Sequence, residues 1–124
     1  MAKLYGAGMD RVVAGVLLGG VAGATGRWAV GEIGWPTWVS LLVVNTVGCA
    51  VLGWVVARWA EREHPVRLAL GVGLCGGFTT FSGLAVELAQ LLDGGELVGA
   101  CALAVGSVVF GLGAFWSIRQ RRVT

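Results

Sequence analysis

Four apolar stretches separated by short polar connections dominate this 124-residue sequence. They cover approximately residues 12–30, 38–57, 66–92 and 97–118. Each has about the 20 residues that an α-helix needs to cross about 30 Å of hydrocarbon. With 56% hydrophobic and 13% charged residues, the chain has too little polar surface for a soluble globule of its size. We therefore predict an all-α integral membrane protein, with residues 1–124 forming a single domain of four transmembrane helices.

The third stretch contains an unusual polar segment, residues 73–82, which reads Gly-Leu-Cys-Gly-Gly-Phe-Thr-Thr-Phe-Ser. Lipid cannot hydrogen-bond to free backbone groups, so irregular chain at membrane depth persists only where it is buried in protein or lines a polar cavity or ion site. We predict that the third helix breaks here, in mid-membrane. Freed carbonyls would suit a hard cation, whereas the ring edges of Phe78 and Phe81 beside hydroxyl donors would suit an anion. The plainer alternative is a packing kink.

The positive charges are distributed very unevenly. Apart from Arg27, every Lys and Arg lies on the side of the termini and the second connection, at Lys3, Arg11, Arg58, Arg62, Arg67, Arg119, Arg121 and Arg122. The positive-inside rule then predicts a cell-membrane protein with both termini in the cytoplasm. We do not expect nucleic-acid binding from this pattern. The start of the chain also resembles a signal peptide, but its removal would leave an odd number of spans, so we expect it to be retained.

A few residues within the spans have functional and structural interpretations that remain open. Asn45 either donates to a passing anion or acts as interhelical glue worth about 1 kcal/mol. Arg27 either anchors the first helix at the interface or attracts anions. Glu87 is expected to pair with an arginine or to cap polar groups, and Ser107 to hydrogen-bond to its own helix.

Small residues shape the expected packing. Gly15, Gly19 and Gly23 form a small-xxx-small stripe that lets another backbone approach closely, within one chain or between two. The cysteines Cys49, Cys75 and Cys101 lie within spans, without the close pairs of zinc or redox motifs, and are expected to be apolar packers. No nucleophile, base or cofactor motif is visible, so we do not expect an enzyme.

Several of these segments together resemble the Fluc (CrcB) family of fluoride channels. The matching residues are 19–27 in the first helix, Val44-Asn45 with Gly48 in the second, residues 73–82 in the third, and Ser107 with Gly111 in the fourth. The family consists of small four-helix membrane proteins that work as antiparallel dimers. The resemblance implies passive fluoride export through pores along the dimer interface, with a structural sodium ion at the centre.

The resemblance also implies roles for individual residues. Gly76 and Thr79 would offer backbone carbonyls to Na⁺, and Phe81 would present a ring edge to fluoride. Asn45 and Ser107 would hydrogen-bond the ion path, with Thr80 and Ser82 also lining the pore. Arg27 would attract anions at the vestibule.

The sequence departs from the family pattern at three positions. Leu84 stands where a second pore phenylalanine is usual, Leu103 where a tyrosine is common, and Leu41 where a threonine is frequent. The strong charge bias also fixes one orientation, which forbids an antiparallel homodimer. We therefore predict a heterodimer with a paralogous CrcB chain that supplies the missing aromatic groups.

Two alternatives belong to other functional classes. The chain could be a non-conducting structural or regulatory subunit of such a channel, an idea that Leu84 and Leu103 make credible. A small proton-coupled multidrug exporter has a similar length, but it needs an acid within its first helix, and residues 12–30 contain no Asp or Glu.

Overall fold

The computed structural model describes residues 2–121, and the side chains of residue 6 and residues 8–121 within them. The helices are α1 (Ala2–Gly31), α2 (Thr37–Arg58), α3 (Pro65–Arg67), the π-helix η1 (Leu68–Cys75), α4 (Gly76–Phe78), α5 (Phe81–Asp93) and α6 (Leu97–Gln120). Four segments in this part of the chain are long and apolar enough to cross a membrane: Gly8–Gly31, Thr37–Arg58, Pro65–Asp93 and Leu97–Gln120. The predicted all-α fold with four apolar spans is confirmed.

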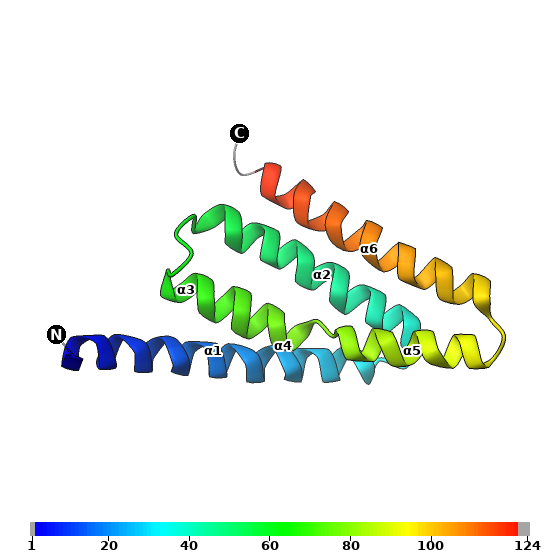
Figure 1. The fold of residues 1–124 in the computed structure, drawn as a ribbon, viewed down its shortest axis with the longest axis horizontal. Helices are drawn as coiled ribbons and strands as arrows, with labels where there is room; N and C mark the ends of the chain where they lie inside the picture. The colour runs from blue at the N-terminus through cyan, green and yellow to red at the C-terminus, as the bar shows by residue number, and fades with distance from the viewer. Residues whose placement is uncertain (1, 122–124) are drawn as a thin grey trace.

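The spans lie side by side in a stack (Figure 1). α6 packs on α2, α2 packs on the third span, and the third span packs on α1, with the α2–α6 and α1–η1 pairs most extensive. α2 therefore has neighbours on two sides and contributes much of the core, including the fully buried Val44 and Val55. Many large apolar side chains elsewhere are exposed, as expected for a surface that faces lipid.

The glycine stripe of α1 brings its backbone against the third span of the same chain. A Cβ atom added at Gly19 would lie 2.9 Å from the backbone nitrogen of Leu74, and one added at Gly23 would lie 2.7 Å from that of Phe78. Only glycine permits contacts this close between two backbones. The stripe thus serves packing within the chain, which settles an alternative that the sequence left open.

The contacts between α2 and α6 define their relative register. A Cβ atom added at Gly53 would lie 3.1 Å from the carbonyl carbon of Phe115, and one added at Gly111 would lie 3.3 Å from Cys49 Sγ. Both contacts join residues separated by the same number of positions, so the two helices run parallel. Continued along the helices, this register sets Asn45 opposite Ser107 and Leu41 opposite Leu103.

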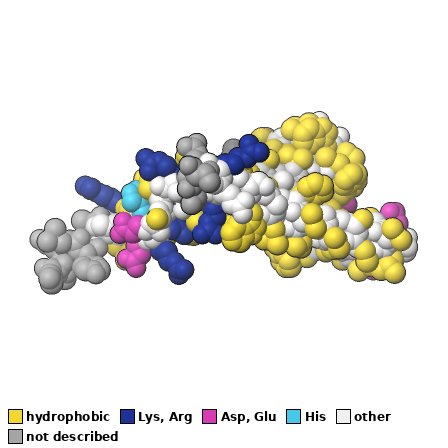
Figure 2. Space-filling model, turned by 90° about the horizontal axis from the view of Figure 1, so that it is seen from above, with side chains coloured by type: hydrophobic (Ala, Val, Ile, Leu, Met, Phe, Trp, Pro, Cys, Tyr) yellow, Lys and Arg dark blue, Asp and Glu magenta, His cyan; other side chains and the backbone are white. Residues whose placement is uncertain are grey.

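The two ends of the bundle differ in charge. The chain termini and the α2–α3 connection lie at one end (Figure 1), and Lys and Arg side chains gather toward that end (Figure 2). Arg67 braces this connection, because its Nη1 donates to the carbonyl oxygens of Trp59, at 3.1 Å, and Ala60, at 2.8 Å. The opposite end carries the connections after α1 and α5, which turn at Gly34 and Gly95 with φ of +89° and +78°.

Candidate ion site at the break of the third span

The third span breaks at Thr79 and Thr80, inside the segment where the sequence predicts it. α4 ends at Phe78, and the next two residues are extended, with φ/ψ of −82°/157° at Thr79 and −146°/116° at Thr80. α5 then begins at Phe81. The break divides the span into two helical halves, and the carbonyls that end the first half form a negative helix terminus.

Side chains capture two backbone N–H groups that a continuous helix would use across the break. Thr80 N donates to Asn45 Oδ1 at 2.8 Å rather than to the Gly76 carbonyl four residues earlier. Gly83 N donates to Thr80 Oγ1 at 3.0 Å rather than to the Thr79 carbonyl. The carbonyl oxygens of Gly76 and Thr79 therefore do not accept the N–H groups that would bond to them in a continuous helix. Such carbonyls at an interrupted membrane helix are suitable ligands for a hard cation such as Na⁺.

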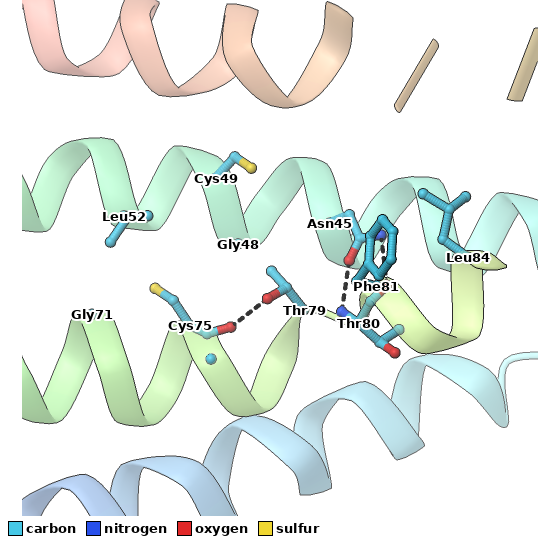
Figure 3. A pocket seen from close by; sticks show the side chains of 11 residues that line it. Asn45, Gly48, Cys49, Leu52, Gly71, Cys75, Thr79, Thr80, Phe81 and Leu84 are labelled. Carbon is cyan, nitrogen blue, oxygen red and sulfur yellow. Dashed lines mark hydrogen bonds between the residues drawn. The ribbon is translucent and has the colours of Figure 1, made fainter. Parts of the chain in front are cut away.

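Asn45 pairs with the backbone of Thr80 through both ends of its amide (Figure 3). Besides accepting from Thr80 N, it donates from Nδ2 to the Thr80 carbonyl oxygen at 3.2 Å. Of the two interpretations left open by the sequence, the structure therefore shows the hydrogen-bonded contact between helices. An amide nitrogen carries two hydrogens, so one Nδ2–H stays available to an additional acceptor.

Arg27 reaches the break from α1. Its Nη1 donates to the Thr79 carbonyl oxygen at 3.2 Å, and the side chain is half-buried. A cation is stabilised near the C-terminal end of a helix, because the free carbonyls there carry partial negative charge. The position of Arg27 one helical turn after Gly23 puts it on the face of α1 that contacts the third span.

A groove of about 330 Å³ lies between α2 and the third span, next to the break (Figure 3). It is lined from α2 by Asn45 and Cys49, and from the third span by Thr79, Thr80 and Phe81, among others. The Phe81 side chain is 83% exposed. The predicted residues Asn45, Thr79, Thr80 and Phe81 are therefore brought together, and Gly76 lines the same groove. Leu84 also lines it, at the place where the family pattern has a second phenylalanine.

A second groove, of about 430 Å³, lies on α5 beyond the break. Ser82, Glu87 and Gln90 line it together with Thr37 of α2. The hydroxyls of Thr80 and Ser82 lie 3.2 Å apart, and Thr80 lines the first groove. This hydroxyl pair therefore connects the two grooves, and Ser82 is set slightly apart from the other predicted residues.

Ser107 does not behave as the sequence suggests. Its Oγ atom is buried and has no hydrogen-bond partner among the described residues, so the expected bond to its own helix is not made. The α2–α6 register sets it opposite Asn45, although it does not line the groove that contains Asn45. Ser40 Oγ is buried and unpartnered in the same way within residues 2–121. Sequence reasoning missed Ser40, and the available signal was a hydroxyl within an otherwise apolar run.

The three leucines that depart from the family pattern occupy two environments. Leu84 faces the groove, whereas Leu41 and Leu103 are buried at 8% and 7% exposure. Leu41 also packs against α5, because a Cβ atom added at Gly83 would lie 2.9 Å from Leu41 Cδ2. Two of the three positions thus contribute to the core between α2 and α6.

Comparisons with known proteins agree on one family. The family model described as "CrcB-like protein, Camphor Resistance (CrcB)" matches residues 14–117. A protein of Gloeobacter violaceus named "Fluoride-specific ion channel FluC" is 40% identical over 112 residues, covering 82% of this chain and 88% of the relative. Proteins with the same name match from Pseudomonas fluorescens (strain Pf0-1), 37% identical over 88% of this chain and 94% of the relative, and from Oceanobacillus iheyensis, 36% identical over 79% and 81%.

Proposed function

This chain belongs to the CrcB family of membrane proteins, whose matched relatives are named fluoride-specific ion channels, and we propose that it conducts fluoride passively out of the cytoplasm. The observation that carries the proposal is the broken span, where donor groups and an exposed aromatic ring border one groove. Fluoride is small and tightly hydrated, so a pore must replace its water with several donors and electropositive ring edges. Larger anions fit such a lining poorly, which favours fluoride.

The donors for fluoride come from both sides of the groove. Asn45 retains one N–H and Thr80 contributes its hydroxyl within the groove, whereas Ser82 on α5 and Ser107 on α6 would supply further donors outside it, along the path. The ring edge of Phe81 carries the positive rim of the aromatic quadrupole. Arg27 raises the local anion concentration at the vestibule, since a guanidinium keeps its charge at any relevant pH.

A structural Na⁺ ion fits the carbonyls at the break. Gly76 and Thr79 would hold it, because side chains engage the two N–H groups that would otherwise bond to their oxygens. When bound, the ion supplies a fixed positive charge near the ends of the two half-helices. Two side chains keep these carbonyls free of helical hydrogen bonds: Asn45 accepts from Thr80 N, and the Thr80 hydroxyl accepts from Gly83 N.

We further propose that the functional unit is an antiparallel pair of this chain with a paralogous CrcB chain. Phe81 is largely exposed and the groove is open on one side, so a partner surface is needed to enclose an ion path. The basic end of the bundle favours a single orientation, with both termini cytoplasmic, and a chain inserted in one orientation cannot pair with an inverted copy of itself. Leu84 leaves one aromatic wall for the partner to provide.

The test is fluoride efflux from liposomes that contain this chain alone or with its paralogue, read with a fluoride electrode. Efflux only from the paired preparation is expected, and chloride efflux should be absent. Phe81→Ile should reduce efflux from the pair, whereas Phe110→Ile, at an exposed phenylalanine on α6, serves as the control and should not. Efflux from the lone chain as an antiparallel dimer would contradict the heterodimer, and no efflux from verified assemblies would contradict the channel proposal.

One observation favours a second candidate, a non-conducting structural or regulatory subunit. Leu84 places an apolar side chain in the groove beside Phe81, and Leu41 and Leu103 fill the space between α2 and α6. If Phe81→Ile leaves the efflux of a conducting pair unchanged, the groove of this chain carries no ions and the structural role is supported.

A further inference from the structure

We propose that the Arg27 guanidinium competes with Na⁺ for the Thr79 carbonyl and so sets how tightly the break holds its cation. The proposal rests on the sodium site of the proposed function and adds a role for Arg27 that differs from attracting anions. In this role Arg27 is a positioning residue of the cation site: its guanidinium, which belongs to the chain itself, sets the affinity of the site for Na⁺.

The packing of α1 delivers the guanidinium to this carbonyl. Gly19 and Gly23 hold α1 so close to the third span that added Cβ atoms would lie 2.9 Å and 2.7 Å from backbone nitrogens of that span. Arg27 follows Gly23 by four residues, so it lies one turn further on the same face. Gly26 lies against the ring of Phe78, where an added Cβ atom would make an ordinary contact at 3.4 Å. The starting point of the Arg27 side chain is therefore fixed by backbone contacts.

The Thr79 carbonyl is available because Thr80 Oγ1 has taken the Gly83 N–H. Arg27 Nη1 donates to this oxygen at 3.2 Å. A carbonyl oxygen has two lone pairs, so it can accept a second interaction. A metal ion on the same oxygen would nevertheless lie within a few ångströms of a permanent positive charge, in a medium that screens charge much less than water. Bound Na⁺ and the bound guanidinium therefore disfavour each other.

The direct consequence is that removal of the Arg27 charge should tighten Na⁺ binding. We expect the Na⁺ concentration at half effect to fall about tenfold in Arg27→Gln and Arg27→Met, which corresponds to about 1.4 kcal/mol. Gln can still donate to the Thr79 carbonyl whereas Met cannot. If both variants tighten Na⁺ binding equally, the cause is therefore the lost charge and not the lost hydrogen bond.

The experiment measures unfolding temperature against Na⁺ concentration, on the assembly that carries fluoride, with N-methyl-D-glucamine maintaining the ionic strength. A ligand that binds only the folded state raises stability as its concentration exceeds its Kd, so the curve reports affinity without a flux assay. Arg58→Gln is the control, because Arg58 lies at the other end of the bundle, over the Trp59 ring at 5.3 Å. The control curve should match the wild type. Unchanged or weaker Na⁺ dependence in the Arg27 variants would overturn the proposal.

A second measurement needs no variant and covers the case in which the variants fail to fold. The ¹⁵N side-chain resonances of Arg27 should shift as Na⁺ is titrated into the wild-type assembly, because the guanidinium loses its acceptor. Resonances that stay constant through the titration would overturn the competition. Fluoride efflux from the same preparations separates the two proposals: efflux with equal Na⁺ dependence in wild type and variants rejects only the role of Arg27. Absence of both efflux and Na⁺ dependence rejects the proposed function as well.

Discussion

The close contact between α1 and the third span can be tested with two neighbouring glycines. An added Cβ at Gly19 would lie 2.9 Å from Leu74 N and 3.3 Å from the carbonyl carbon of Gly73, and it would overlap the carbonyl oxygen of Ala69. At Gly20, the nearest atom is the Gly73 carbonyl oxygen at 3.9 Å, an ordinary contact. Gly19→Ala and Gly20→Ala therefore add the same methyl group to the same helix, and only one of them meets a neighbouring backbone.

The expected magnitudes follow from these contacts. Relief at Gly19 requires the two backbones to separate by about half an ångström or more, because ordinary contacts begin at about 3.4 Å. Overpacking of this kind costs about 1–3 kcal/mol. The gain in helix propensity on replacing glycine by alanine is at most about 1 kcal/mol. The added methyl at Gly19 meets backbone atoms, which cannot rotate away as a side chain can, so the overpacking cost lies in the upper part of this range, at about 2–3 kcal/mol. Gly19→Ala should thus destabilise the protein by about 1–2 kcal/mol after this offset, whereas Gly20→Ala should be neutral or stabilising by less than about 1 kcal/mol.

Reversible unfolding in mixed micelles, followed by circular dichroism as the SDS fraction rises, measures both variants on one scale. Gly113→Ala supplies a further control in α6, where an added Cβ meets no atom within 4 Å. The reasoning would be refuted if Gly19→Ala were as stable as the wild type, or if Gly20→Ala lost as much stability as Gly19→Ala.

Substitutions at three further positions test the break and the proposed ion path. Thr80→Ala removes the side-chain acceptor of Gly83 N and should cost about 1 kcal/mol in the same unfolding assay, whereas Thr80→Ser should restore most of it. Asn45→Leu leaves the N–H and carbonyl of Thr80 without their partners and should cost about 2–4 kcal/mol; a loss below 1 kcal/mol would show that the pairing is dispensable. Ser107→Ala removes a hydroxyl that has no partner within residues 2–121, so stability should hold while fluoride efflux from the paired assembly falls. Unchanged efflux would remove Ser107 from the ion path.

Local composition was sufficient to predict the spans and the break. Apolar length determines which segments can cross hydrocarbon, and lipid tolerates a segment such as residues 73–82 only where its backbone is satisfied elsewhere. The stripe of Gly15, Gly19 and Gly23 likewise predicted close packing, since small residues at helical spacing permit little else. These inferences depend on neighbours in the sequence, which are known before the fold is.

The details of the site depend on contacts between elements that are distant in sequence. Whether Asn45 bonds to the backbone or remains free is decided by how α2 is placed against Thr80, and no local pattern encodes that placement. The same holds for Arg27, whose acceptor is separated from it by an entire span. The π-helical hydrogen bonding of η1 was also not predicted, because an apolar run has no periodicity that distinguishes it from an α-helix.

The facing pair Leu41 and Leu103 has a consequence for where charge can travel. An ion at the level of Asn45 and Ser107 would meet these two buried leucines if it continued along the α2–α6 seam toward the start of α2, and neither side chain offers a donor. Exchanging hydration for hydrocarbon costs an ion several kcal/mol, so the two leucines form an apolar barrier to ions along this seam. In the proposed channel, the α2–α6 seam toward the start of α2 is thereby closed to anions, so beyond Asn45 and Ser107 the path has to follow the third span and the proposed partner chain.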